Sequence, residues 1–348
     1  MAYLKTSNNR KILCVGLTCL DIIQTCTYYP PEDSDHRSVD YRWQRGGNAS
    51  NTCTVLSLLG SSCEFLGVLS KEEHSQFLKD DMKKYNIDFS KCQEVDGYRC
   101  PISTIILSLS TGTRTILHYN PNLPEITLEN FGCLKLKNYS WIHFEGRNVT
   151  QVLAMMETIE KYNKIMKGMN EKSNKIVNKQ FMEITVSLEL EKPQPELLLL
   201  LPFADIVFIS KDFAQRRGCD NMDEILENIG AKAKQGTVLI CAWGDRGATA
   251  RTSDGILVKS SAFPPEVIVD SLGAGDTFNA AVIDYLNNIK MDAESEEYNS
   301  LNNPTTISEH SLNKFNDPNI LHAAIIFGCH IAGAKIGMKG YDGLVNYK

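Results

Sequence analysis

The chain has 348 residues, with 43% apolar and 22% charged side chains and a formal net charge of −6. This composition is typical of a soluble globular protein, and the acidic balance argues against general binding to nucleic acid or to membrane surfaces. No apolar secretory segment occupies residues 1–10, and the longest purely apolar run, residues 197–201, is too short to span a bilayer. The 11 cysteines lack metal-like pairing, so we expect free thiols in a reducing cytoplasm.

Apolar runs and helical spacing alternate along the chain. In the first half we expect strands over residues 11–17, 63–69, 102–109 and 113–119, and helices over residues 46–59 and 75–85. In the second half we expect strands over residues 141–144, 184–190, 206–209, 238–242 and 267–269, and helices over residues 152–162, 197–201, 222–234, 276–286 and 321–335. Such alternation predicts a mostly parallel sheet with helices on both faces.

Two polar segments interrupt this pattern. Residues 164–180 are rich in Lys, Asn and Met, and residues 291–318 are rich in Asn, Ser and acidic side chains. Neither segment shows the apolar periodicity of a packed element, so both are expected to be long, mobile surface loops inserted into the fold.

The strongest chemical signal lies in residues 270–281, where a predicted strand runs into Gly273-Ala274-Gly275-Asp276 and then into a helix. Free N–H groups at a helix start favour an anion, and small residues let a phosphate approach the backbone. The Asp276 carboxylate could take a proton from a substrate hydroxyl beside these N–H groups. The alternative is an ordinary helix start with Asp as a capping residue.

A second cluster, residues 45–51, contains two glycines followed by Asn48 and Asn51 on one face of a helix start. Amides can bond several sugar hydroxyls, because each both donates and accepts; a capping box with a Gly turn is the alternative. Asp21 follows the first strand, at the sheet edge where α/β folds bind ligands, although such an Asp is more often a turn residue.

Weaker candidates complete the set. Arg114 could bind a phosphate or be a solvated hairpin residue. Residues 244–247 could border a nucleotide or form only a tight turn. His143 and His330 have apolar neighbours and are interpreted as core histidines with their hydrogen bonds satisfied.

The clusters at residues 46–51 and 270–281, in this order, resemble the two signatures of the ribokinase-like carbohydrate kinase family. The resemblance is closest to members that phosphorylate ketohexoses. It runs through Arg42-Trp43-Gln44-Arg45-Gly46-Gly47-Asn48-Ala49-Ser50-Asn51 and through residues 12–17, 141–148, 207–212 and 238–243. It implies one kinase domain over residues 1–348, a three-layer α/β/α sandwich with a small β-sheet lid from about residues 21–41 and 98–119.

The resemblance also implies roles for individual residues. Asp276 would be the catalytic base, and Gly273, Ala274 and Gly275 the anion hole for the transferring phosphate. The ketose would be held by Asp21, Gly47, Asn48 and Asn51, together with Asp276. ATP would be bound by Arg114, Gly244, Asp245, Arg246, Gly247, Cys329, Ala332 and Gly333, and by the anion hole. Many relatives carry Asn-x-x-Glu for magnesium where this chain has Ser210-Lys211-Asp212, so no protein metal ligand is assigned.

The activity implied is transfer of the ATP γ-phosphoryl group to the C1 hydroxyl of a ketohexose, with D-fructose giving D-fructose 1-phosphate. Mg²⁺ would bridge the phosphates, and K⁺ is a further candidate ion. The expected protein is a cytoplasmic homodimer joined through its lids, with no nucleic-acid or membrane partner. The alternatives are a kinase of the same fold acting on a nucleoside or an aldose, and a non-catalytic sugar sensor, against which Asp276 argues.

Overall fold

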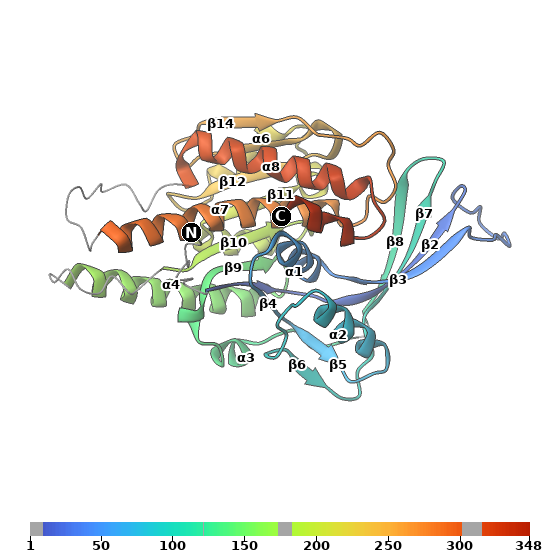
Figure 1. Ribbon diagram of the computed structural model, residues 1–348, viewed down its shortest axis with the longest axis horizontal. Helices are drawn as coiled ribbons and strands as arrows, with labels where there is room; N and C mark the ends of the chain where they lie inside the picture. The colour runs from blue at the N-terminus through green and yellow to red at the C-terminus, as the bar shows by residue number, and fades with distance from the viewer. Residues whose placement is uncertain (1–9, 121, 173–182, 301–314) are drawn as a thin grey trace, which may run out of the picture.

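The computed structural model describes residues 10–120, 122–172, 183–300 and 315–348. At its centre lies an eight-stranded sheet in the order β14-β13-β12-β11-β10-β9-β1-β4 (Figure 1). Its strands are β1 (Lys11–Val15), β4 (Cys63–Leu66), β9 (Tyr139–Glu145), β10 (Thr185–Leu190), β11 (Ile206–Ser210), β12 (Val238–Ala242), β13 (Ala248–Arg251) and β14 (Leu257–Ser260). The strands from β4 to β12 pair in parallel, and β13 and β14 add an antiparallel edge.

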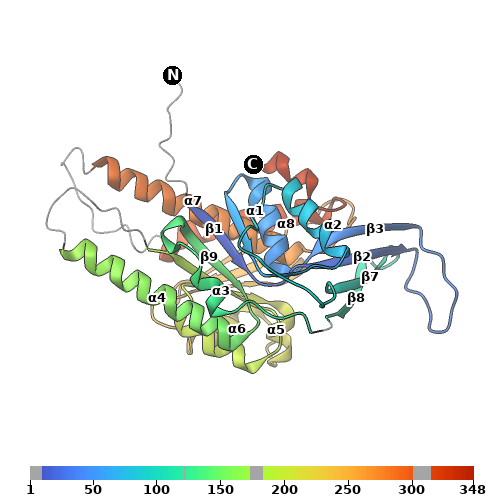
Figure 2. The ribbon, with the colours of Figure 1, turned by 90° about the horizontal axis from the view of Figure 1, so that it is seen from below.

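Helices cover both faces of this sheet, as Figure 2 shows. One face carries α1 (Asn48–Leu59), α7 (Ala274–Ser300) and α8 (Pro318–Ile336); the other carries α3 (Leu128–Gly132), α4 (Val149–Lys172), α5 (Lys211–Arg216), α6 (Met222–Gly230) and the 3-10 segment η2 (Pro195–Phe203). Successive side chains of β1 point to opposite faces of the sheet. Leu13 and Val15 therefore join the core beneath α4 and α6, and Ile12 and Cys14 join the core beneath α1, α7 and α8. The predicted three-layer α/β/α sandwich is confirmed.

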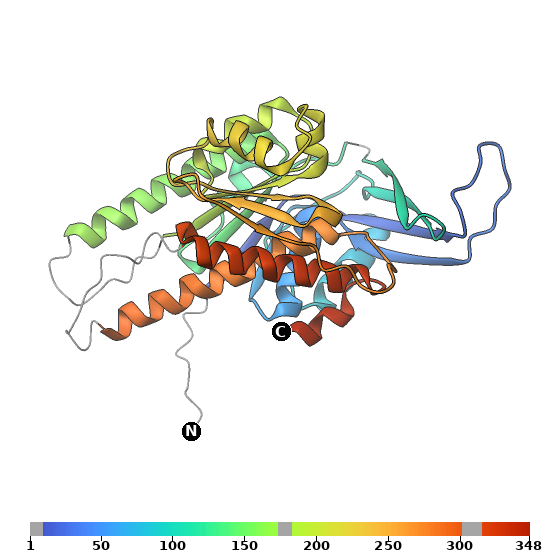
Figure 3. The same ribbon diagram turned by 90° about the horizontal axis from the view of Figure 1, so that it is seen from above.

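A separate four-stranded sheet stands off the main sheet (Figures 1 and 3). Its order is β3-β2-β7-β8. Its strands are β2 (Cys19–Cys26), β3 (Asp40–Gly46), β7 (Ile102–Ser108) and β8 (Thr113–Tyr119). The predicted small β-sheet is therefore present. Beside it lie α2 (His74–Lys84) and a two-stranded pair of β5 (Val68–Ser70) and β6 (Gln93–Val95).

Among the described residues, α8 is the helix whose length and apolar composition would allow it to cross a membrane. In the fold it packs against α7, β13 and β14, and side chains such as Leu321 and Ile325 are fully buried there. These contacts are those of a core helix in an α/β sandwich.

The predicted strand at residues 267–269 is wrong. Val267, Ile268 and Val269 are 68%, 53% and 44% exposed and belong to none of the three sheets. The main sheet ends at β14, and the N–H groups of Val269 and Asp270 both donate to the Ile336 carbonyl, 2.8 and 3.1 Å away. The segment before α7 is thus held by the end of α8 and not by a strand ladder.

The predicted loops are also partly wrong. Helix α4 continues to Lys172 and α7 to Ser300, so residues 164–172 and 291–300 are helical. Their polar composition reflects helices that extend past the sheet, where an apolar stripe is not needed. Residues 173–180 and 301–314 lie outside the described part of the chain. Beyond them, Phe315 packs against Trp141 with ring centroids 5.7 Å apart.

Two element boundaries differ for local reasons. The predicted strand over residues 63–69 divides into β4 and β5 at Gly67, where a Cβ atom would lie 2.6 Å from the Gly16 carbonyl oxygen. The helix predicted to reach residue 234 ends at Gly230. A Cβ atom at Gly230 would lie 2.7 Å from Arg251 Nη1. In both cases a glycine permits a close approach between segments distant in sequence.

Candidate active site

The start of α7 faces open space. Gly273 has φ 73°, which only glycine adopts readily, and the helix begins at the next residue. A Cβ atom at Gly275 would meet nothing in the described chain within 4 Å. The first N–H groups of a helix have no intrahelical acceptor, so they can bind an anion; the Ala274 N–H makes only a long 3.4 Å bond to the Ser271 carbonyl.

Asp276 lies in this first turn with 8% of its surface exposed. Asn51 Nδ2, from the first turn of α1, donates to Asp276 Oδ2 at 2.7 Å. Burial raises the pKa of Asp276 to about 7, although the Asn51 hydrogen bond acts in the opposite direction. A carboxylate with this pKa suits proton transfer near neutral pH. The other side-chain atom, Asn51 Oδ1, is buried and has no partner among the described residues.

Two strands add carboxylates that the sequence reasoning missed. Glu145 ends β9, and its paired residue on β10 is Glu189. Asn48 Nδ2 donates to Glu189 Oε2 and to Glu191 Oε2, both at 3.1 Å, and Asn279 Nδ2 donates to Glu189 Oε1 at 2.9 Å. Burial raises the pKa of Glu189 well above its usual value, and the nearby Asp276 raises it further. Both glutamates lie at carboxyl ends of parallel strands, so the rule that selected Asp21 could have found them.

Asp21 lies within β2 and is buried, so the interpretation of it as a turn residue is wrong. Burial raises its pKa to about 6. Its carboxyl group rests on Gly46, where a Cβ would lie 2.2 Å from Asp21 Oδ2. Gly47 has φ 98° and precedes α1 without any side-chain cap, so the capping-box alternative is also wrong. Glycine is needed at residue 47 because a Cβ would lie 2.2 Å from the Leu17 carbonyl oxygen.

Behind the turn lies a buried charge cluster that sequence reasoning missed. Arg42 Nη2 donates to Asp270 Oδ2 at 2.7 Å, and the Lys335 ammonium lies 2.9 Å from both Asp270 Oδ2 and the Asp270 carbonyl. Tyr341 packs directly on the turn, since a Cβ at Gly273 would be 1.9 Å from its hydroxyl oxygen. A lysine inside the apolar pattern of α8 was the available signal, because a fully buried lysine requires a partner.

The predicted nucleotide-side residues lie on three elements. Arg114 is exposed on β8. Its charge acts on the buried Lys335: burial lowers the pKa of Lys335, Asp270 opposes this, and the charges of Arg42 and Arg114 lower the pKa further. The second element is the 3-10 turn η3 (Gly244–Arg246), closed by a 2.8 Å bond from Trp243 N–H to the Gly247 carbonyl. The third is α8, with Cys329 buried and Ala332 and Gly333 near its end. A Cβ at Gly333 would lie 2.0 Å from the Phe263 carbonyl oxygen.

Of the two histidines interpreted as core residues, only His143 lies in the core. His330 is exposed and stacks on Phe263 with ring centroids 3.6 Å apart, so it is not a core histidine. His143 is fully buried, and burial lowers its pKa to about 3. Its Nδ1 lies 2.8 Å from Ser187 Oγ, but its Nε2 has no partner in the described part of the chain.

Within the described ranges, no group of three or more His, Cys, Asp or Glu side chains is placed to hold a metal ion. Ser210, at the position of the missing Asn-x-x-Glu motif, instead caps α5 by accepting the Phe213 N–H at 3.1 Å. The site thus combines a carboxylate of near-neutral pKa, an open helix N-terminus and an amide oxygen without a partner. Such an arrangement can deprotonate a hydroxyl and stabilise an anionic group transferred to it.

Comparison with known proteins agrees with this chemistry. Residues 9–298 match the description "pfkB family carbohydrate kinase". Ketohexokinase from Mus musculus is 40% identical over 338 residues, covering 97% of this chain and 99% of the mouse protein. Ribokinase from Giardia lamblia superposes with a TM-score of 0.76 at 15% identity, covering 97% and 96% of the two chains. Adenosine kinase from Sinorhizobium meliloti has a TM-score of 0.68 at 17% identity, covering 97% and 98%.

Proposed function

The chain belongs to the pfkB family of carbohydrate kinases, and we propose that it transfers the γ-phosphoryl group of ATP to the C1 hydroxyl of a ketohexose, with D-fructose as the first substrate to test. The likeness to mouse ketohexokinase over nearly the whole chain supports the ketohexose as acceptor. The phosphoryl-transfer chemistry is supported by the residues themselves.

The observation that carries the proposal is the placement of Asp276. Its buried carboxylate, with a pKa of about 7, lies at the first turn of α7 beside the open N-terminus at Gly275. In the proposed reaction Asp276 takes the proton of the C1 hydroxyl as that oxygen attacks the γ-phosphorus. The N–H groups of Gly273, Ala274 and Gly275 stabilise the charge on the transferring group. The bond to the β-phosphate oxygen breaks, and ADP leaves.

The sugar is proposed to lie between α1 and the small sheet. Asn51 holds Asp276 through Nδ2 and presents Oδ1 as a free acceptor for a sugar hydroxyl. Asp21 supplies a second buried acceptor from β2. Asn48 already donates to Glu189 and Glu191, so its part in sugar binding is to position these carboxylates, and Gly47 supplies the close backbone approach.

ATP is the phosphoryl donor of the family. We assign its phosphates to Arg114 and the α7 N-terminus, and its nucleoside to residues 244–247 with Cys329, Ala332 and Gly333. Magnesium is proposed to arrive with the ATP phosphates, because the described side chains provide no ligand set of their own. K⁺ is a candidate activator to test by its addition, and no step depends on it.

The deciding experiment is incubation with D-fructose and MgATP, with the product examined by ³¹P and ¹³C NMR. Phosphate on C1 is the expected result. Phosphate on C6, or turnover of adenosine or an aldose without turnover of ketoses, would reject the ketohexose assignment. Binding of fructose without any ADP release would favour the sugar-sensor alternative.

We also propose a homodimer joined through the small sheets. On one protomer β8 is exposed along its whole length, and Leu117 and Tyr119 are 60% and 56% exposed. A small sheet with an exposed apolar face is marginal alone, and an identical sheet can cover it through a two-fold contact. Light scattering at micromolar protein should give the mass of a dimer, and a fully active monomer would reject this arrangement. A cytoplasmic location is proposed from the 11 free thiols.

A further inference from the structure

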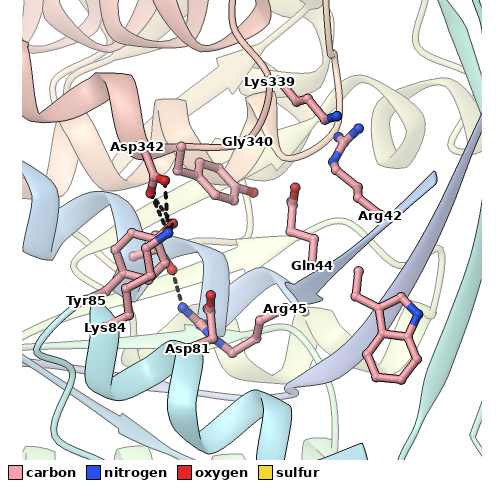
Figure 4. Close-up of a pocket in the computed structure, with 12 residues that line it drawn as sticks. Arg42, Gln44, Arg45, Asp81, Lys84, Tyr85, Lys339, Gly340 and Asp342 are labelled. Atoms are coloured by element: carbon pink, nitrogen blue, oxygen red, sulfur yellow. Dashed lines mark hydrogen bonds and ion pairs between the residues drawn. The ribbon is translucent and has the colours of Figure 1, made fainter. Parts of the chain in front are cut away.

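A polar pocket lies between β3, α2 and residues 339–342 (Figure 4). Its volume is about 170 Å³. It is lined by Arg42, Trp43, Gln44, Arg45, Thr54, Asp81, Lys84, Tyr85, Lys339, Gly340, Tyr341 and Asp342. None of these side chains was assigned to the sugar, the nucleotide or the catalytic base. The space far exceeds the roughly 10–15 Å³ that one water molecule needs, so a small ligand fits.

Three buried polar atoms of the lining have no partner among the described residues: Arg42 Nε, Gln44 Nε2 and the Tyr341 hydroxyl. Tyr341 is only 3% exposed, so its hydroxyl is withdrawn from bulk water. All three groups can donate a hydrogen bond, and two of them can only donate. A buried donor without an acceptor is costly, so this convergence indicates a ligand rich in acceptor oxygens.

The four basic side chains of the lining are each paired with a carboxylate. Arg45 pairs with Asp81 and Lys84 pairs with Asp342 inside the lining. Figure 4 shows the Arg42 guanidinium and the Lys339 ammonium close together at one end of the pocket. Each has a carboxylate partner outside the lining, Asp270 for Arg42 and Asp40 for Lys339. Arg42 nevertheless keeps its Nε free, and an ammonium has three donors, so both can also bind a ligand oxygen.

We propose that this pocket binds a phosphate group, either inorganic phosphate or the phosphate of a small phosphorylated sugar, separately from the catalytic site. Arg42 Nε, Gln44 Nε2, the Tyr341 hydroxyl and the Lys339 ammonium supply the donors. Lys84, on the opposite wall, is already bonded to Asp342 and to the Tyr85 hydroxyl and contributes only its charge. A tetrahedral dianion offers enough oxygens to accept from all of them, and guanidinium and ammonium groups are the usual phosphate ligands in proteins.

The position of the pocket connects it to catalysis. Arg42 and the Gly340 N–H both bond Asp270 Oδ2, and Tyr341 rests on Gly273. A phosphate that draws on Arg42 and Tyr341 therefore acts on the segment that forms the anion hole. The pocket is therefore placed to couple the binding of a phosphate group to the state of the anion hole while lying outside the sugar site.

The test is equilibrium dialysis of the full chain with ³²P-labelled inorganic phosphate in phosphate-free buffer. Saturating D-fructose and a non-hydrolysable ATP analogue with Mg²⁺ occupy the catalytic site, so that only a second site is measured. Lys339→Gln should weaken the measured binding by about tenfold, the usual effect of losing a charged hydrogen-bond donor, and Lys84→Gln, which removes only a nearby charge, should weaken it by a smaller factor. Lys83→Gln is the matched control, since Lys83 is the next lysine on α2 but pairs with Asp80 outside the pocket.

Competition then identifies the source of the phosphate. Displacement of the label by D-fructose 1-phosphate at lower concentration than by unlabelled phosphate assigns the pocket to a sugar phosphate, and the reverse order assigns it to inorganic phosphate. Absence of binding once the catalytic site is filled would overturn the proposal. Equal binding by the three lysine variants and the parent chain would overturn it as well. If fructose itself proves not to be a substrate, the lysine variants still decide the matter, because they lie outside the catalytic site.

Discussion

Replacing Asn51 by leucine should move the pH dependence of the kinase to higher pH. Leucine has nearly the same size as asparagine but cannot donate the 2.7 Å hydrogen bond from Nδ2 to Asp276 Oδ2. That bond favours the ionised carboxylate, so its loss must raise the pKa of Asp276 above its present value of about 7. A base that titrates at higher pH is protonated, and therefore inactive, over a wider acidic range.

The size of the shift follows from the bond. A hydrogen bond to a charged group contributes about 1.5–3 kcal/mol, and one pKa unit corresponds to about 1.4 kcal/mol, so the pKa should rise by roughly one to two units. The acid limb of kcat/KM, which reports groups of the free enzyme, should move from near pH 7 to roughly pH 8–9. The height of the profile will also fall, since Asn51 is proposed to contact the sugar. The pH at which the acid limb falls, and not the height of the profile, therefore reports the pKa of Asp276.

Initial rates at subsaturating fructose and saturating MgATP, measured over about pH 5.5–9.5, report this shift because the range extends to both sides of the expected pKa values. Asn48→Leu is the matched control: it lies one turn earlier on α1 and bonds Glu189 and Glu191, so it should give no upward shift. An unshifted acid limb in Asn51→Leu would show that the limb does not report Asp276, and the assignment of the base would fail.

Three further changes test the rest of the argument. Asp276→Asn should lower kcat by about 10²–10⁴-fold with ATP affinity retained, and a near-normal kcat would reduce Asp276 to a helix cap. Gly275→Ala adds a methyl group that meets no described atom, so the melting temperature should stay the same or rise while kcat falls. If the melting temperature and kcat both fell, residue 275 would be a packing residue and not part of the anion hole. His143→Gln should change how the free energy of unfolding depends on pH. The pKa of His143 is about 3 in the folded protein and near 6.5 in the unfolded chain, so protonation favours the unfolded chain as pH falls below 6.5. At pH 5 this lowers the free energy of unfolding of the parent protein by about 2 kcal/mol, and the variant should lack this loss. Urea denaturation of both proteins at pH 5 and 7 measures this, and identical pH slopes would contradict it.

Much of the fold followed from sequence because its signals are local. Helix α1 ends at Leu59, as predicted, because Gly60 follows it with φ 100°. Residues 267–269 have the same β-branched character as a real strand, and only the long-range bonds to Ile336 show that they do not join a sheet. Polar helices that extend past the sheet, in α4 and α7, resemble loops because they have no neighbour to impose a stripe.

The sequence points most directly to residues that carry their own chemistry, such as Asp276 and Asn51, and the structure brings these two side chains together. Glu189 and Asp270 were missed because their importance depends on partners far along the chain: Asn279 is 90 residues away from Glu189, and Lys335 is 65 residues away from Asp270. A sequence pattern contains the carboxylate but not the group that makes its burial possible. Pocket residues such as Lys84 and Lys339 carry even less local signal, since surface lysines are common.

The bracing of the Asp270–Gly273 segment by residues 335–341 has a consequence for biosynthesis. The N–H groups of Val269 and Asp270 end on Ile336, the Asp270 charge is balanced by Lys335, and Tyr341 supports Gly273. A nascent chain that has already produced α1, the main sheet and α7 still lacks these supports until residues 335–341 leave the ribosome. The proposed anion hole should therefore form only after residue 341 has been made, and a chain cut short before residue 335 would fold much of its sandwich without assembling it.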